Sequence, residues 1–358
     1  EHKNQIVKYD AVLIDEIQDY HRSWMEIIKN FFRDPKGDYV LFGDVKQNIY
    51  GQPTLQKDVV TNVRGVNELK YCFRSDFKVR DLAQSFQQNV FGDKYDTDDF
   101  SENGSYDFFG QQQQKEGYIN YMYLQDKNNI ASLYTIIRGN ILNKAGNISP
   151  NDITILGYTT GLLRTFDAYY RYASREKTNS MLETIETMYM THLNYIGKNN
   201  GGNPNLAWFN NKLFPKRTTL YDYDLIKLRQ HIAVLFTIYD LYVSFPDTFK
   251  ERLIEECEKC RISFDVLIAF RKHYEEVLTQ FKKEVYSSNY KNIRDNKKLH
   301  FWMNSGTIKI STINSFKGWE SEVVFLVLEP KYDKSTTFNL SFDELLYTGI
   351  TRCKRNLI

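Results

Sequence analysis

Short apolar runs recur along the chain, and each is followed by polar or charged residues. The clearest are Ala11–Ile14, Ile153–Gly157 and Val323–Leu328. Runs of this kind, bounded by turn signals, are typical of strands that are buried on both faces of a parallel sheet. Segments with helical spacing lie between them, and strands that alternate with helices indicate an α/β fold. We therefore predict a parallel sheet with helices packed on its faces.

The expected elements occur in two separate stretches of the chain. In the first stretch we expect strands at Ala11–Ile14, Tyr39–Phe42, Glu68–Cys72, Tyr118–Leu124 and Ile153–Gly157, a turn at Pro35–Asp38, and helices at Trp24–Phe32, Val79–Phe91 and Ile130–Leu142. The acidic, glycine-rich segment Asp93–Gly117 is expected to be a long surface loop. In the second stretch we expect strands at Ile308–Ser311 and Val323–Leu328, a helix at Phe342–Ile350 and the start of a strand at Asn356.

Between these stretches, from about Leu163 to His300, nearly all apolar residues have helical spacing. The predicted helices are Met181–Leu193, Leu225–Phe245, Phe249–Cys260 and Val266–Tyr286, followed by a charged linker at Asn289–Lys298. The simplest organisation is an α/β domain that is interrupted by a helical insertion and then completed.

Composition excludes several classes of protein. Lys plus Arg (47) nearly balances Asp plus Glu (45), so any nucleic-acid contact requires a local basic patch. Four cysteines in 358 residues favour a reducing compartment over a disulfide framework, and the single pair Cys257 and Cys260 lacks the further ligands of a zinc site. No run is long enough to cross a membrane and no leader pattern opens the chain, so we expect a soluble, cytoplasmic protein without a membrane partner.

Two carboxylates, Asp15 and Glu16, directly follow the first apolar run. Carboxylates at the end of a parallel strand can hold Mg²⁺ and activate water for nucleotide hydrolysis. In such a site Asp15 would bind the metal, and Glu16 would orient and deprotonate the attacking water. By itself, an acidic pair after a strand is more often a helix cap or a solvated turn, but the Gln18-Asp19 that follows favours the metal site.

Further polar residues follow the other expected strands. Gly43-Asp44 and Gln47 come after the second strand, where the Gln47 amide could sense a γ-phosphate or the lytic water; a simple polar turn is the alternative. Arg74, Lys317 and Arg352 also lie where turns follow strands. Arginine stabilises charge on a transferring phosphoryl group, although a single such arginine is usually a surface residue.

A phosphate-binding loop of the form G-x-x-x-x-G-K-[ST] is absent from the 358 residues. The one Gly-Lys pair, Gly197-Lys198, is followed by Asn and lacks the earlier glycine. The sequence thus contains half of a nucleotide site. Both ends of the chain lie close to expected strands, which predicts that the chain is part of a longer protein.

Five segments, DEIQD, FGDVKQNIYG, LKYCFRSD, IKISTINSFKGWESEVVFLV and LLYTGITRCKRNL, occur in this order. They resemble motifs II, III, IV, V and VI of superfamily 1 helicases of the UvrD/Rep/PcrA type. The resemblance implies two RecA-like domains. Residues 1–65 would be the C-terminal part of the first, residues 66–162 and 301–358 would form the second, and residues 163–300 would be a helical insertion domain.

The resemblance also implies roles for individual residues. Asp15 would coordinate Mg²⁺, Glu16 would be the catalytic base, Gln47 would couple the γ-phosphate to the DNA site, Arg74 and Arg352 would be arginine fingers, Asp44 and Glu320 would contact the nucleotide, and Tyr50 and Thr312 would contact single-stranded DNA. The implied cofactors are ATP and Mg²⁺, and the implied partners are single-stranded DNA and single-strand/double-strand junctions. The sequence departs from the family pattern at Gln52 and Pro53, where an aromatic residue and an arginine are usual, and at Asn314, which replaces a common histidine.

The leading hypothesis is an ATP-dependent DNA helicase or translocase that moves 3′→5′ on single strands, as the resemblance implies. The isolated chain should hydrolyse no ATP, because nothing in it cradles the β-phosphate. One alternative is a relative without the loop that acts as a DNA-binding or protein-interaction scaffold. Another is a different P-loop ATPase, such as a recombination or transport motor, which leaves Tyr50 and Thr312 unexplained.

Overall fold

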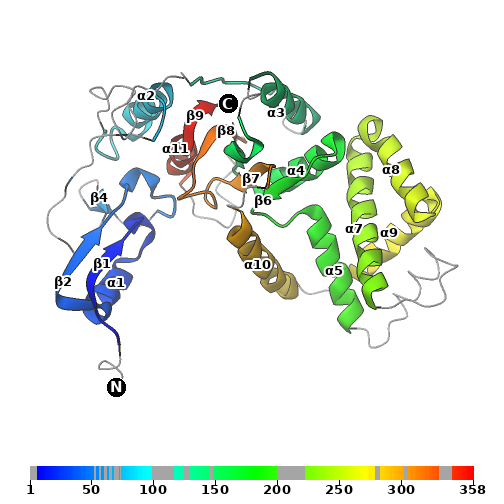
Figure 1. Cartoon of the computed structure of the whole chain (residues 1–358), viewed down its shortest axis with the longest axis horizontal. Coiled ribbons are helices and arrows are strands. Elements are labelled where there is room, and N and C mark those ends of the chain that lie inside the picture. The colour runs from blue at the N-terminus through cyan, green and yellow to red at the C-terminus, as the bar shows by residue number, and fades with distance from the viewer. Residues whose placement is uncertain are drawn as a thin grey trace. The chain divides into compact units, whose positions relative to one another are not determined.

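The computed structural model of the chain is an α/β protein with a five-stranded parallel sheet in the order β6-β7-β5-β8-β9 (Figure 1). The α/β fold class predicted from the sequence is confirmed at this level. The structure describes residues 6–51, 54–55, 58–59, 63, 67, 72, 74–98, 117–124, 130–144, 148–199, 222–278, 283–301, 305–329 and 341–358. The chain divides into two compact units, residues 1–123, 152–158 and 312–358 in the first and residues 124–151 and 159–311 in the second.

The strands have the following bounds: β1 (Tyr9–Ile14), β2 (Arg33–Leu41), β3 (Thr54–Leu55), β4 (Asp58–Val59), β5 (Ile153–Gly157), β6 (Thr178–Ser180), β7 (Ile308–Thr312), β8 (Ser321–Val327) and β9 (Cys353–Leu357). β1 and β2 form a separate parallel pair, and β3 and β4 form an antiparallel pair. In the main sheet, β8 pairs in parallel with both β5 and β9. Every residue of β5 is buried, as expected for a central strand of a covered parallel sheet.

The helices of the first unit are α1 (Arg22–Ile27), which continues as a π-helical turn to Phe32, α2 (Phe77–Phe86), which continues likewise to Phe91, and α11 (Phe342–Thr351). Two short 3₁₀ turns, Ile17–Asp19 and Val45–Gln47, follow β1 and β2. Because parallel strands end at the same edge of a sheet, these two turns lie next to each other. This edge carries most of the residues that the sequence singled out.

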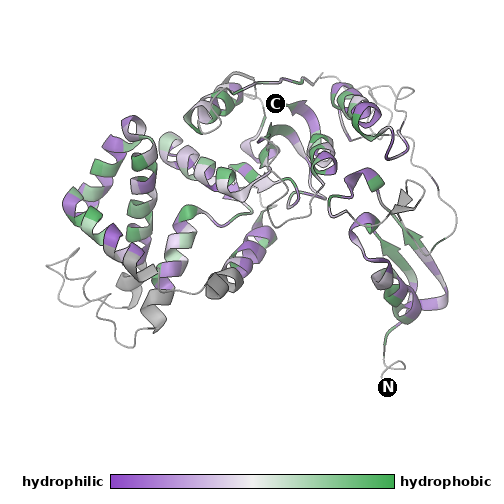
Figure 2. Ribbon diagram, turned by 180° about the vertical axis from the view of Figure 1, so that it is seen from behind, coloured by the Kyte–Doolittle hydropathy of each residue, from purple (hydrophilic) through white to green (hydrophobic). Residues whose placement is uncertain are grey.

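The helices of the second unit are α3 (Ile130–Lys144), α4 (Thr160–Ser174), α5 (Ile185–Asn199), α7 (Asp222–Ser244), α8 (Pro246–Cys260), α9 (Phe264–Leu278) and α10 (Lys283–His300). The core between α5, α7, α8 and α9 contains the fully buried rings of Phe236, Phe270 and Tyr274. Figure 2 shows hydrophobic and hydrophilic residues alternating along these helices, which is the pattern of helices that are buried on one face. The helices predicted at Leu225–Phe245 and Phe249–Cys260 are confirmed, and α5 begins four residues later than expected. The single helix predicted at Val266–Tyr286 corresponds to two helices, because α9 ends at Leu278 and α10 begins at Lys283.

Three predictions about the first unit fail or lie outside the described residues. The expected turn at Pro35–Asp38 lies within β2, because the pairing with β1 shifts register between Tyr9 and Ala11 and the extra residues of β2 form a bulge, where proline is tolerated. The expected strand Tyr118–Leu124 makes one bridge, between Ile119 and Leu357. Of the strand expected at Glu68–Cys72, only Cys72 is described, and it is not in a strand; residues 99–116 of the expected loop Asp93–Gly117 are likewise outside the described residues.

Two predictions about the second unit were also wrong. The expected linker Asn289–Lys298 is part of α10. The many charged residues of this stretch obscure a helical face: Tyr290 and Arg294, four residues apart, contact His192 and Glu183 of the second unit. The short strand β6 was missed within the stretch predicted to be helical. The four-part domain division stays a prediction. No helix within the described ranges is both long and apolar enough to cross a membrane.

Candidate functional site

The acidic loop after β1 has a strained backbone. Glu16 has φ 54 and ψ 44, a left-handed conformation that residues other than glycine adopt rarely. The backbone N–H of Glu16 donates to Asp15 Oδ1 at 2.9 Å, and the Asp15 side chain is otherwise exposed. Strained residues of this kind gather at functional sites, where the surrounding structure holds them in place. The loop therefore presents Asp15 to solvent and turns Glu16 toward the neighbouring strand end.

Gln18 joins this loop to the turn that follows β2. Its side chain is fully buried, its Nε2 donates to Glu16 Oε2 at 2.5 Å, and its Oε1 accepts from the Asp44 backbone N–H at 3.2 Å. Gly43 makes this approach possible, since a Cβ there would lie 2.7 Å from Gln18 Oε1 and 2.5 Å from the Ile17 side chain. The turn after β2 therefore helps to orient the Glu16 carboxylate, because it holds the Gln18 side chain that donates to Glu16.

Asp44 and Gln47 continue the chain of hydrogen bonds. Asp44 caps the turn Val45–Gln47, its Oδ1 accepting from the Lys46 backbone N–H and its Oδ2 from Gln47 Nε2, both at 3.0 Å. Burial raises the pKa of Asp44, against the lowering effect of Lys46 and Gln47. The other end of the Gln47 amide, Oε1, accepts from Arg352 Nη2 at 2.9 Å. A continuous path of side-chain contacts therefore runs from Glu16 to Arg352.

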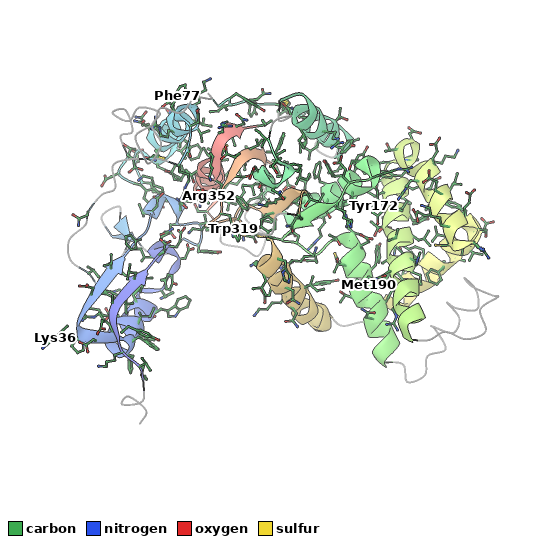
Figure 3. All side chains as sticks on the ribbon, in the orientation of Figure 1. Lys36, Phe77, Tyr172, Met190, Trp319 and Arg352 are labelled. Atoms are coloured by element: carbon green, nitrogen blue, oxygen red, sulfur yellow. The ribbon has the colours of Figure 1, made fainter. Side chains whose placement is uncertain are left out.

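Arg352 is a buried cation that makes no ion pair with any residue in the described part of the chain. It lies at the C-terminal end of α11 (Figure 3) and is 2 % exposed. Within the described ranges its acceptors are Gln47 Oε1 and, at 3.4 Å, Thr351 Oγ1; it makes no ion pair there, and its Nε has no hydrogen-bond partner. Burial and the nearby Arg74 lower the pKa of Arg352, and the charges of Glu16, Asp44 and Glu320 only partly offset this effect. A guanidinium in this situation is ready to bind an anion, because leaving it unpaired is costly.

The charge of Arg74 acts on Arg352, but Arg74 itself forms an ion pair with Glu320. Its Nε contacts Glu320 Oε2 at 2.8 Å, and the other oxygen of Glu320 contacts Lys354 Nζ at 2.5 Å. The Arg74 side chain remains half exposed. Glu320 thus lies between two cations, and it can release Arg74 to another anion without losing all charge compensation.

Lys317 binds the acidic loop and the second turn together. Its Nζ lies 2.7 Å from Asp19 Oδ1, 3.1 Å from the Gln47 backbone oxygen and 3.4 Å from Glu16 Oε2, and its side chain is 7 % exposed. Burial raises the pKa of Asp19, while the hydrogen bond and charge of Lys317 lower it. This contact places a positive charge beside the carboxylate that the sequence predicts to be the catalytic base.

Tyr50 and Thr312, the residues predicted to contact DNA, have different surroundings. Tyr50 is 46 % exposed; partial burial and the charge of Asp19 raise its pKa. Thr312 is 4 % exposed and ends β7, and its Oγ1 accepts from the Ser315 backbone N–H at 3.3 Å. The Tyr50 ring is therefore accessible to a ligand, whereas the Thr312 hydroxyl faces the following turn. Both DNA roles stay predictions.

The structure brings together Glu16, Asp44, Gln47 and Arg352 in one network and places Arg74 with Glu320 next to it. Sequence reasoning assigned no contact to the connecting residues Gln18, Asp19 and Lys354, which lie two or three residues from predicted site residues. No cluster of three or more His, Cys, Asp or Glu side chains suited to a metal occurs in the described part of the chain. Mg²⁺ needs only one or two carboxylates when phosphate and water oxygens complete its shell, and the exposed Asp15 carboxylate fits that need.

Neither a scan against protein-family models nor a search of curated proteins returned a match to this chain.

Proposed function

We propose that this chain belongs to an ATP-dependent DNA helicase or translocase similar to the UvrD/Rep/PcrA type of superfamily 1. The observation that carries the proposal is the hydrogen-bonded path from Glu16 through Gln18, Asp44 and Gln47 to Arg352. It links residues from opposite ends of the sequence that the motif resemblance assigns to one nucleotide site. The implied architecture is the C-terminal part of one RecA-like domain followed by a second one with a helical insertion.

Each residue of the path has a chemical task in this proposal. Asp15 would hold Mg²⁺, which supplies charge neutralisation at the phosphates when bound. Glu16, held by Gln18, would accept a proton from the attacking water. Arg352 and Arg74 would stabilise the charge that develops on the transferring phosphoryl group.

Gln47 would connect hydrolysis to DNA movement. Its amide contacts Arg352 on one side and Asp44 on the other, so a change at Arg352 reaches the turn that precedes Tyr50. Every base presents a π-face, which lets an exposed aromatic ring hold single-stranded DNA without regard to sequence. Three residues after Gln47, Tyr50 is accessible for such stacking.

The pair β1–β2 supports the view that this site is completed by further α/β structure. Parallel strands are normally covered on both faces. Here Tyr9, Leu13 and Val40 are 54 %, 63 % and 40 % exposed. Apolar strand residues exposed to this extent call for additional strands or helices. In the proposal, a segment carrying the phosphate-binding loop packs on this pair.

A scaffold without catalytic activity explains the site less well. A scaffold gains nothing from burying Arg352 without an ion pair to another described residue, because an unpaired buried charge destabilises the folded state. The same residue is useful when a nucleotide phosphate binds beside it. The buried guanidinium therefore favours the enzyme over the scaffold.

The test is the substitution Glu16→Gln in the intact protein that supplies the phosphate-binding loop. Removal of the general base should lower the kcat of ATP hydrolysis stimulated by single-stranded DNA by roughly 10²–10⁴-fold. The Kd for ATP should change little, because Gln can still accept the hydrogen bond from Gln18. Steady-state ATPase assays and nucleotide-binding titrations measure the two quantities.

Glu26→Gln on α1 is a matched control, since this carboxylate makes no ion pair within the described residues. It should leave kcat unchanged. Normal turnover by the Glu16→Gln protein would refute the assignment of Glu16 as the base. Absence of DNA-stimulated ATPase activity in the intact wild-type protein would refute the proposed function as a whole, and support the scaffold.

A further inference from the structure

A second hydrogen-bonded path joins the turn after β2 to α11. It starts in the turn itself at Lys46, whose Nζ contacts both carboxylate oxygens of Asp98 at 3.0 Å. Asp98 Oδ2 accepts from Gln87 Nε2 at 3.1 Å, and the Asp98 backbone N–H donates to Gln87 Oε1 at 2.8 Å. Gln87 Nε2 also donates to the hydroxyl of Tyr347 on α11 at 2.8 Å. These four residues form the Gln87 bridge, which reaches the helix that ends at Arg352.

The Gln87 bridge is largely buried. Gln87 is fully buried, Tyr347 and Lys46 are 3 % and 6 % exposed, and Asp98 is partly exposed. Both N–H groups of the Gln87 amide donate within the bridge. Burial raises the pKa of Tyr347 well above its ordinary value, so its hydroxyl stays protonated. A satisfied buried network of this kind fixes one geometry, whereas apolar side chains of similar size would often give equal stability.

Gln87 lies where the hydrogen bonding of α2 changes. It is the first residue of the π-helical turn Gln87–Phe91. Single π-helical turns are rare and occur frequently at functional sites. The rings of Phe86 and Phe91 both pack against the Tyr347 ring, with centroids 6.3 Å and 5.6 Å away. The end of α2 therefore holds the Tyr347 ring by packing and its hydroxyl by a hydrogen bond.

Two links of different chemistry thus join the same turn to α11. In the first, Arg352 Nη2 donates to the neutral oxygen of the Gln47 amide. In the second, the Lys46 ammonium pairs with the Asp98 carboxylate. A guanidinium binds a charged acceptor more strongly than an amide oxygen. An anion can therefore replace Gln47 at Arg352, while the Gln87 bridge still connects the turn to the helix.

We propose that the Gln87 bridge positions Arg352. It keeps α11 against the turn Val45–Gln47 while the Arg352 guanidinium exchanges the Gln47 oxygen for a phosphate oxygen. Gln87 and Asp98 do not touch the nucleotide in this role, so they are positioning residues. The role rests on the proposed function, because the nucleotide supplies the phosphate oxygen.

Modification of arginine by phenylglyoxal, followed by mass spectrometry, tests the position of Arg352 in the 358-residue chain without a nucleotide. Tyr347→Phe removes the hydroxyl and keeps the ring packing. It should speed modification of Arg352 by about 5–100-fold, the range for leaving one buried polar group without its partner. Gln87→Leu and Lys46→Met should act in the same direction, because each breaks the bridge. Lys46→Arg keeps the cation and should stay within a few-fold of wild type.

Two control variants separate position from general stability. Tyr170→Phe removes a comparable hydroxyl in the second unit, since Tyr170 is 1 % exposed and donates to Glu176 Oε2 at 2.8 Å. Met25→Ala weakens the core beside β1 and β2, where Met25 is fully buried. Neither should change the modification rate of Arg352. A wild-type rate in Tyr347→Phe, or equal acceleration by Met25→Ala, would overturn the positioning role.

The ATPase rate of the intact protein that supplies the phosphate-binding loop gives the functional readout. Tyr347→Phe should lower kcat by about 10–100-fold, because displacement of a reacting group by about 1 Å can cost this much. The KM for ATP should stay within a few-fold, whereas a merely structural role would leave the kcat of the folded fraction unchanged. An unchanged kcat would overturn the positioning of Arg352. A wild-type protein without ATPase activity would instead refute the helicase proposal, and the modification rates distinguish the two failures because they require no turnover.

Discussion

At the residue scale, the candidate site is a set of charges that are only partly compensated. Arg352 makes no ion pair with another described residue, whereas Lys317 Nζ is buried among three oxygen atoms. We therefore expect Lys317 to stabilise the fold, and in the proposed function Arg352 would bind an anionic ligand. Glu16 depends on both, since its carboxylate contacts Lys317 directly and reaches Arg352 through the network.

Lys317→Met should therefore lower the stability of the first unit. Asp19 and Glu16 would lose their shared cation, and we expect the free energy of unfolding to fall by about 2 kcal/mol, between the values for exposed and fully buried pairs. Urea denaturation measures the change. Lys36→Met is the control, because Lys36 is exposed and its side chain makes no ion pair in the described residues; it should stay within about 0.5 kcal/mol of wild type. Equal stability of the two variants would contradict the structural role of Lys317.

At the element scale, a single buried carboxylate joins α10 to α4 in the second unit. Glu183 is fully buried and makes ion pairs with Arg164 of α4 and with Arg294 of α10, the latter at 2.6 Å. Although burial raises the pKa of Glu183, its hydrogen bonds from Arg294 and the charge of Arg164 lower the pKa below 4.5, its ordinary value.

The ion pairs of Glu183 with Arg164 and Arg294 predict how the free energy of unfolding depends on pH. Because the pKa of Glu183 is lower in the folded state, its contribution is complete above about pH 4.5 and is lost as the pH falls through the folded-state pKa. Glu183→Gln should cost about 3 kcal/mol at pH 7, and should reduce the loss of stability on acidification. Urea denaturation at pH 7 and at pH 3.5 measures both effects.

Glu251→Gln on α8 is the control, since this carboxylate is exposed and unpaired in the part of the chain described. It should follow the wild-type pH profile. If Glu183→Gln followed that profile too, the ion pairs of Glu183 would not be the source of the acid sensitivity.

At the scale of the whole molecule, the proposed nucleotide site has an acidic side and an arginine side, but the 358 residues contain no phosphate-binding loop of the form G-x-x-x-x-G-K-[ST]. The purified 358-residue chain should therefore show no ATP hydrolysis, with or without single-stranded DNA, because the β-phosphate has no cradle. A coupled ATPase assay measures this, with an unrelated DNA-stimulated ATPase as the positive control. Turnover by the purified chain would contradict the prediction and would require another phosphate-binding element.

The sequence by itself determined the α/β class, most helices and the strands β1, β5, β7 and β8, because these depend on local periodicity and on apolar runs that need burial. It also marked Glu16, Gln47 and Arg352 as residues of interest. Their contact could not be read from local pattern, since it requires the ends of β1 and β2 to meet the end of α11. Tertiary packing likewise decided that a charged stretch is α10 and that Pro35 lies in a strand, because the neighbours that stabilise both are distant in the chain.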